Sequence, residues 1–152
     1  LGDVYKRQHL DMDANKRYLG FQDACRRLGV SKPSAVDAAE RQFVRMDYQE
    51  TVAAIFRNHP DVDGILCSND VIAAEIIQYC RRHEIDIPGR LKLIGYDDTR
   101  LASLCSPQLT TIHQPVEDIC RYAVESIIHA SSGRVVPTCA VFPVTLVERE
   151  TT

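Results

Sequence analysis

Long apolar runs, an excess of positive charge and paired cysteines are all missing from this 152-residue sequence. No apolar run approaches the ~20 residues that a membrane-spanning helix needs, and the first residues lack the basic-then-apolar pattern of a signal peptide. The net charge of -3 and the pI of about 5.9 are not typical of a nucleic-acid-binding surface. We therefore expect a cytoplasmic globular protein with no membrane segment and no direct contact with DNA.

The cysteines show no C-x-x-C pair. They stand at positions 25, 67, 80, 105, 120 and 139. Cys25, Cys80 and Cys120 fall on apolar faces of expected helices, and Cys67 falls in an expected strand. This placement favours free, buried thiols in a reducing compartment. A disulfide framework or a zinc site is the alternative that the spacing leaves open.

Catalytic signatures are also missing. The sequence contains no G-x-S-x-G elbow, no Walker loop, no G-x-G-x-x-G and no H-E-x-x-H. The pair Asp97-Asp98 lacks a companion His or Glu at an informative spacing for metal binding or acid–base catalysis. We expect no enzyme, no cofactor and no metal, with an α/β enzyme that uses these aspartates as an open alternative.

What is present is a strand–helix–strand unit in residues 63–98. Residues 64–68 form a short apolar run, and Asn69 or Asp70 then caps a helix. Apolar residues recur at helical spacing along this helix, at Ile72, Ala73, Ile76, Ile77 and Cys80. Residues 91–96 form a second buried strand, and a crossover of this length predicts that the two strands are parallel.

This unit places polar side chains at strand ends. Asn69 follows the first strand and Asp97 follows the second. Ligands of open parallel sheets bind in the crevice outside the carboxyl ends of the strands. The sequence therefore predicts an amide and a carboxylate in one cleft.

The rest of the chain repeats the alternation of strands and helices, which predicts an α/β layered domain. We expect helices from about Ala14 to Gly29, from Asp47 or Tyr48 to residue 58, and from Pro115 to residue 131. We expect strands at 42–46, at 109–112 and, around Pro143, within 139–147; residues 1–10, 30–40 and 99–108 show no regular pattern. The helix from Pro115 has an apolar stripe but few elements to cover it, so we expect a piece of a larger protein.

Five separated motifs resemble the effector-binding core of the lactose/galactose-repressor (LacI/GalR) family of bacterial transcription regulators. They are R-Y-L-G-F-Q-D-A (17–24), D-G-I-L-C-S-N-D (63–70), I-P-G-R-L-K-L-I-G-Y-D-D (87–98), L-T-T-I-H-Q-P (109–115) and P-V-T-L-V-E-R (143–149). The resemblance covers the chain from about Ala14 to its end. It implies an incomplete, parallel, doubly wound α/β sheet of the periplasmic-binding-protein-like (type I) fold, with a small ligand between two subdomains.

The resemblance also implies a domain map. Residues 14–112 would form the C-terminal subdomain, residues 113–137 a helix of the N-terminal subdomain, and residues 138–152 a strand returning to the C-terminal one. Residues 1–13 would be a ragged or foreign start, because the family's glycine-containing first strand is not recognisable there. The family's helix-turn-helix head is not found in this sequence, so contact with DNA would need a head outside this chain.

Five residues are candidates for ligand binding by this resemblance: Arg17, Asn69, Asp97, Tyr48 and Gln114. A guanidinium or a carboxylate can bond two adjacent sugar hydroxyls. Simpler roles stay open for most of them: a solvated arginine, a helix cap for Asn69, a core ring for Tyr48 and a hinge contact for Gln114.

Three neighbouring positions have expectations of their own. Asp98 should bond local backbone, and His113 should be solvated, with no partner evident in the sequence. Val116 stands where some family members carry a ligand-facing aromatic residue, so we expect that wall of the site to differ in shape.

The function that follows is the ligand-sensing core of a sugar-responsive repressor. The resemblance implies a homodimer through the helix Val71–His83 and the segment Thr99–Ser106, with a small-molecule effector, expected to be a sugar. The alternative from another class is a periplasmic sugar-binding protein of a transporter, which would share the fold and the cleft.

Overall fold

The described strands form a single six-stranded sheet. The computed structural model describes residues 2–5, 13–30, 34–37 and 48–152, with side chains in 16–30 and 48–152. The strand order is β2-β1-β3-β4-β5-β6. Its strands are β1 (Gly2–Tyr5), β2 (Ser34–Asp37), β3 (Gly64–Cys67), β4 (Lys92–Asp97), β5 (Thr110–His113) and β6 (Thr145–Val147). All neighbouring strands are parallel except β5 and β6, which are antiparallel.

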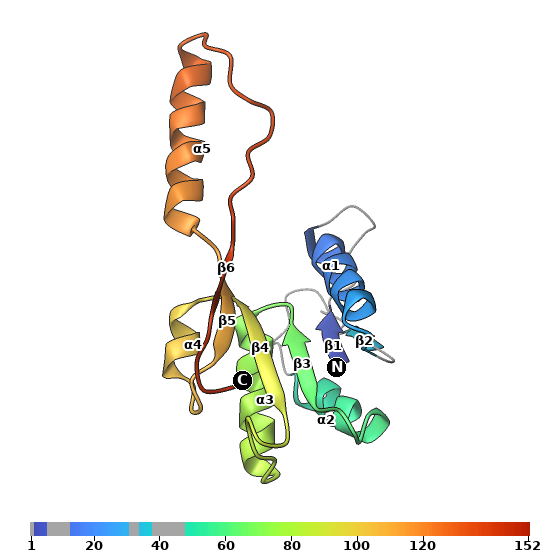
Figure 1. Ribbon diagram of the computed structural model, residues 1–152. Helices are drawn as coiled ribbons and strands as arrows, with labels where there is room; N and C mark the ends of the chain where they lie inside the picture. Colours follow the sequence, from blue (N-terminus) through green and yellow to red (C-terminus); the bar gives the residue numbers. More distant parts are fainter. Residues whose placement is uncertain (1, 6–12, 31–33, 38–47) are drawn as a thin grey trace.

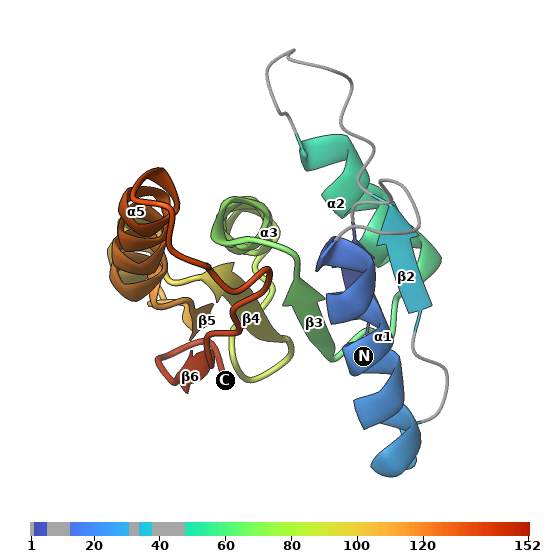
Figure 2. The ribbon, with the colours of Figure 1, turned by 90° about the horizontal axis from the view of Figure 1, so that it is seen from above.

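Five helices connect these strands: α1 (Asp13–Arg27), α2 (Gln49–Asn58), α3 (Asp70–Arg82), α4 (Arg100–Leu104) and α5 (Val116–Ser131). Helix α3 packs against α2, α4 and the strands β3 and β4. Figures 1 and 2 show α5 standing apart from these elements, beyond the end of β5. None of the described helices is long and apolar enough to cross a membrane.

The core lies between α2, α3 and the central strands. The predicted strand–helix–strand unit is confirmed as β3, α3 and β4, with β3 and β4 parallel. The five apolar residues predicted for one face of α3 are all buried. They pack with Ile65 of β3, Leu93 of β4 and Val52 and Ile55 of α2. Burial of a side chain of this kind stabilises a fold by about 1.5–3 kcal/mol, so this layer is the main source of stability.

The N-terminal third differs most from the sequence-based prediction. Residues 2–5 form β1, which pairs with both β2 and β3 and so lies inside the sheet. The loop predicted for residues 30–40 contains β2. Both strands are four residues long, too short to show a period in the sequence. The strand predicted at 42–46 lies outside the described residues.

Smaller differences follow along the chain. The segment 99–108 contains the short helix α4. Pro115 occupies the N-cap of α5 instead of its first turn. Around Pro143, the single strand β6 begins after the proline. In α1, Phe21 and Cys25 are buried, but Leu28 is exposed beside Gly29, whose φ of +67° ends the helix.

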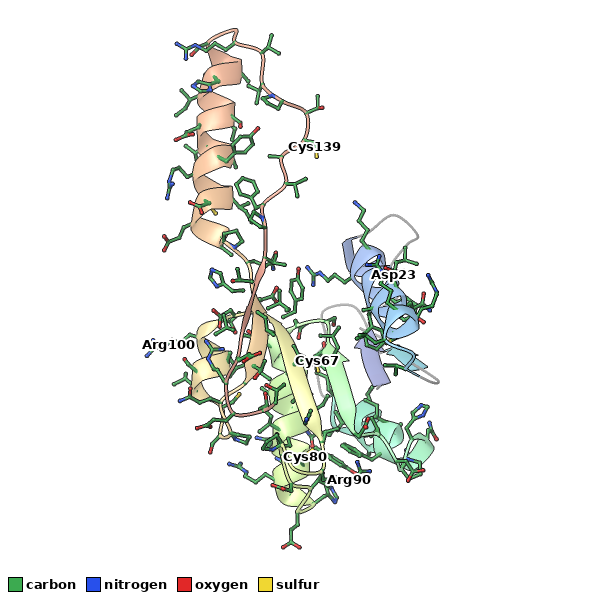
Figure 3. All side chains as sticks on the ribbon, viewed as in Figure 1. Asp23, Cys67, Cys80, Arg90, Arg100 and Cys139 are labelled. Atoms are coloured by element: carbon green, nitrogen blue, oxygen red, sulfur yellow. The ribbon has the colours of Figure 1, made fainter. Side chains whose placement is uncertain are left out.

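The cysteines divide by location. Cys25, Cys67 and Cys80 are buried free thiols, as predicted, and burial raises the pKa of Cys80 to about 12. Cys120 is exposed, contrary to the prediction, because no residue of α5, all of which is described, is buried in this chain. Figure 3 shows Cys67 and Cys80 in the body of the protein and Cys139 on the segment that runs back beside α5.

Near the end of the chain, Thr151 forms hydrogen bonds with both β4 and β5. Thr151 is fully buried, and its Oγ1 accepts a bond from Thr110 N (2.8 Å) and donates one to Leu93 O (2.7 Å). Its carbonyl accepts a further bond from Leu93 N at 2.9 Å. Thr151 thereby bonds both β4 and β5 beside the Ile94–Thr110 pair, where the pairing of these two strands begins.

Thr151→Val is expected to lower the free energy of unfolding by about 1–3 kcal/mol, because it leaves Thr110 N buried without its acceptor. The measurement is urea unfolding followed by circular dichroism. Thr145→Val is the matched control: Thr145 is exposed in β6, so a change within about 0.5 kcal/mol is expected. Equal losses in the two variants would contradict the structural role of Thr151.

Candidate ligand-binding site

Polar side chains from three elements meet at the carboxyl end of the sheet. Asp97 is the last residue of β4, and Gln114 follows β5 directly. In the parallel register of β4 and β5, Asp97 lies opposite His113. Gln114 therefore reaches Asp97, and its Nε2 donates a hydrogen bond of 2.6 Å to Asp97 Oδ1.

Arg17 approaches this edge from α1. Its guanidinium lies 3.8 Å from the ring centroid of Tyr96, the neighbour of Asp97. Its Nη1 also donates to Ser68 O at 3.1 Å, at the residue before Asn69. An arginine held by a ring face and one carbonyl keeps other N–H donors available for a further acceptor. The structure thus brings Gln114 and the charge of Arg17 to Asp97, and it places Arg17 beside Ser68, the neighbour of Asn69. Ligand binding by these residues stays a prediction.

The charge of Asp97 is not fully compensated in this arrangement. Burial raises the pKa of the Asp97 carboxyl above its usual value, and the nearby negative charge of Asp70 acts in the same direction. The bond from Gln114 and the positive charge of Arg17 lower this pKa but offset only part of the effect. A ligand that donates hydrogen bonds would supply the stabilisation that the ionised carboxylate lacks.

Asn69 caps α3. Its Oδ1 accepts a hydrogen bond of 2.9 Å from Ile72 N, in extended backbone geometry at the N-cap position. The predicted capping role is therefore confirmed. This bond uses only the side-chain oxygen, so the two N–H donors of the amide are not engaged in the cap. Ligand contact by Asn69 stays a prediction.

Tyr48 lies at the N-cap of α2 and is 4% exposed. It belongs to the same hydrophobic cluster as Val52 and Ile55. Core packing, the simpler of the two roles considered for this ring, is the one that the structure displays. Stacking of Tyr48 on a sugar stays a prediction.

Asp98 and His113 differ from the prediction. The Asp98 carboxylate bonds two side chains instead of local backbone: Arg149 Nη2 at 2.7 Å and His113 Nδ1 at 3.0 Å. His113 is half exposed but has this partner. The reason is tertiary: β6 pairs antiparallel with β5, so Arg149, two residues after β6, lies beside the start of β5. There its backbone N donates to Thr110 Oγ1, and its guanidinium reaches Leu109 O and Asp98. Val116 is 55% exposed at the start of α5.

Asp70 also belongs to this region, although the sequence indicated only a possible helix cap for it. It is 1% exposed and accepts bonds from Thr99 N (2.7 Å), Thr99 Oγ1 (3.0 Å) and Thr111 Oγ1 (2.6 Å). Gly95 is the sequence signal that accompanies it. A Cβ at Gly95 would clash with Asp70 Oδ1 and lie 2.8 Å from Leu109 Cδ2, so β4 passes directly over the carboxylate.

A metal centre does not emerge from the geometry. Among residues with described side chains, no three of His, Cys, Asp and Glu are grouped so that they could hold an ion. What the edge offers instead is one guanidinium, one carboxylate and amide groups, a set that both donates and accepts hydrogen bonds. Such a set suits a small polyhydroxylated molecule.

Sequence comparison identifies the domain family of the chain. Residues 4–152 match the family model of the periplasmic binding protein-like domain. The ribose operon repressor of Halalkalibacterium halodurans is 31% identical over 140 residues, covering 91% of this chain and 41% of that protein. The HTH-type transcriptional regulator GalR of Escherichia coli is 27% identical over 148 residues, covering 93% and 41%. This chain spans less than half the length of these relatives.

Solved structures show the same fold. A LacI family transcriptional regulator from Arthrobacter sp. FB24, in complex with lactose, has a TM-score of 0.79 at 28% identity, over 99% of this chain and 56% of that one. A periplasmic binding protein/LacI transcriptional regulator from Alkaliphilus metalliredigens, complexed with D-xylulofuranose, has a TM-score of 0.83 at 26% identity, over 99% and 56%. The chain therefore belongs to the periplasmic binding protein-like domain family, in the form found in LacI-family regulators.

Proposed function

We propose that this chain is the ligand-sensing core of a sugar-responsive transcriptional repressor. The observation that carries the proposal is the convergence of Arg17, Asp97 and Gln114 at the carboxyl edge of the sheet. The ribose and sucrose operon repressors among the relatives, and solved relatives with bound lactose or D-xylulofuranose, support a sugar as effector. In this site Arg17 and Asp97 bond sugar hydroxyls, and Asn69, Gln114 and Tyr48 complete the contacts.

The mechanism follows two-state logic. An effector shifts a conformational equilibrium only by the difference between its affinities for the two states. In this proposal Arg17, Asn69 and Asp97 form one side of the cleft. Helix α5, which begins two residues after Gln114, leads away from the sheet (Figure 1). A sugar that bonds both sides favours one arrangement of the subdomains, and in the whole protein this arrangement would be transmitted to a DNA-binding head outside this chain.

The domain map is part of this proposal. Residues 14–112 and 138–152 form the C-terminal subdomain, since β5 and β6 complete the same sheet as β3 and β4. Residues 113–137 belong to the N-terminal subdomain, which accounts for the exposed apolar side chains of α5. These are Val116, Val124, Ile127 and Ile128. The resemblance implies a ragged or foreign start for residues 1–13, yet β1 within them is an internal strand, so we assign residues 2–5 to the C-terminal subdomain.

We also propose that the protein acts in the cytoplasm as a homodimer. The dimer contact uses residues 71–83 and 99–106, where α3 packs beside α4. Val71 and Leu104 are 41% and 67% exposed there, and apolar side chains on adjacent helices are suited to an isologous interface.

A periplasmic sugar-binding protein is the competing function with the same fold. The curated relatives are repressors, which supports the regulator. The coding sequence upstream decides between them, because a helix-turn-helix supports the regulator and a signal peptide supports the transporter protein. A hydrolytic role for Asp97 would require turnover of a substrate that Asp97→Asn abolishes.

Sugar binding by this chain is tested with 15N-labelled protein titrated with D-ribose, lactose and sucrose. We expect shifts at Asn69, Asp97 and Gln114 with one of these sugars, at a dissociation constant in the millimolar range, about -4 kcal/mol. Binding is weak because one side of the cleft is outside this chain. Glycerol at equal mass concentration is the control for solvent effects. Shifts confined to other regions contradict the site, and a micromolar constant contradicts the domain map.

A further inference from the structure

Asp70 has bonds that a helix cap does not need. It is the first residue of α3 and is almost completely buried, and Asn69 already caps the helix. Buried carboxylates are costly unless they are fully hydrogen-bonded. Its three bonds all go to groups beyond the ends of β4 and within β5, namely Thr99 N, Thr99 Oγ1 and Thr111 Oγ1. The Asp70 carboxylate therefore bonds the segment after β4 and a residue of β5, and it does not cap its own helix.

These bonds enclose the turn that carries Asp97. Thr99 N follows the turn directly and donates to Asp70 Oδ2 at 2.7 Å. Thr111 Oγ1 donates to Asp70 Oδ1 at 2.6 Å and lies 3.4 Å from Asp98 N. One carboxylate thus holds the backbone after Asp97 and, through the hydroxyl of Thr111, the backbone within the turn.

The turn requires such support because its backbone is strained. Asp97 and Asp98 have φ values of +108° and +52°, which L-residues rarely adopt. Residues in this conformation persist only where their surroundings impose it. Gly95 contributes by having no Cβ, since any Cβ would clash with Asp70 Oδ1.

We propose that Asp70 is a positioning residue of the ligand site, whose carboxylate fixes the Asp97–Asp98 turn at a set distance from Asn69. Asp70 is bonded covalently to Asn69 and by hydrogen bonds to Thr99, so it connects the two strand ends that carry the polar groups of the site. The inference rests on the proposed function. Holding the groups in their bound geometry before ligand arrives reduces the entropic cost of binding.

Two variants weaken the hydrogen bonds between Asp70 and the Asp97–Asp98 turn in different ways. Asp70→Asn removes the charge and an acceptor, and Thr111→Val removes only the hydroxyl that joins Asp70 to the turn. Ile76→Val is the matched control. Ile76 is fully buried in the same helix but lies away from the turn, and its truncation lowers stability without changing a contact of Asp70. The control separates a positioning role from a general loss of stability.

The first measurement is the affinity for D-ribose by NMR titration. We expect Asp70→Asn to weaken it at least about tenfold and Thr111→Val at least about threefold, with Ile76→Val within about twofold of the parent. The second measurement is the backbone conformation of Asp97 and Asp98, from three-bond HN–Hα couplings, with a change expected in the first two variants alone.

Affinity and couplings that stay at parental values in the folded variants would overturn the proposal. If Asp70→Asn does not fold, Thr111→Val decides alone. If the parent chain binds no sugar, the proposed function fails, and the couplings still decide whether Asp70 positions the turn.

Discussion

Arg149→Met is expected to lower the free energy of unfolding by about 2–4 kcal/mol. Arg149 Nη2 pairs with Asp98 at 2.7 Å, and its Nη1 donates to Leu109 O at 2.8 Å. Removing one partner of a fully buried pair costs about 3–5 kcal/mol, and the 19% and 17% exposure of these two side chains reduces that value. Urea unfolding followed by circular dichroism measures the loss.

Arg57→Met provides the control with the same change of side chain. Arg57 and Glu50 form an ion pair of 2.9 Å, but 64% and 86% of their side chains are exposed. A pair of this kind is worth at most about 1 kcal/mol. The Arg149 variant must therefore lose clearly more stability than the Arg57 variant. Similar losses of stability in the two variants would mean that the Arg149–Asp98 pair contributes no more than a surface ion pair.

Asp97→Asn is expected to weaken D-ribose binding about tenfold to a hundredfold. The amide keeps the size of the side chain but replaces a charged acceptor, whose bonds to hydroxyls contribute about 1.5–3 kcal/mol. The measurement is the same NMR titration as for the parent chain. Asp61→Asn removes a charge from an exposed residue before β3 and should leave the affinity unchanged. Parental affinity in the Asp97 variant would remove this residue from the site.

Asp97→Asn is expected to weaken sugar binding but not to lower the stability of the fold. Burial raises the pKa of Asp97, so the folded chain binds the proton more tightly than the unfolded chain. Ionisation of Asp97 therefore lowers stability above the folded pKa, and this loss disappears as the pH falls through that pKa toward the unfolded value. At pH 7 we expect Asp97→Asn to be at least as stable as the parent, with the difference shrinking toward pH 4. A variant that is less stable at pH 7 contradicts this account of the carboxylate.

Prediction from sequence succeeded where one element supplied enough periodic residues. The five apolar positions of α3 fixed its buried face, and the strands on either side had to be parallel because the connection is long. It failed for β1 and β2, whose four residues give no period and whose partners are distant in the chain. The strand ends indicated Asn69 and Asp97, whereas Arg17, Tyr48 and Gln114 came only from the resemblance to a family, because periodicity does not identify them.

The sequence by itself determined the central strand–helix–strand unit, and with it the placement of Asn69 and Asp97 at one edge of a parallel sheet. Only the tertiary structure decided their partners: Gln114 for Asp97, Arg149 for Asp98, and the Asp97–Asp98 turn for the carboxylate of Asp70. The physical reason is the range of the interactions. Helical and strand periods arise between residues a few positions apart, whereas these polar contacts join residues 17 to 51 positions apart that meet only after the sheet has formed.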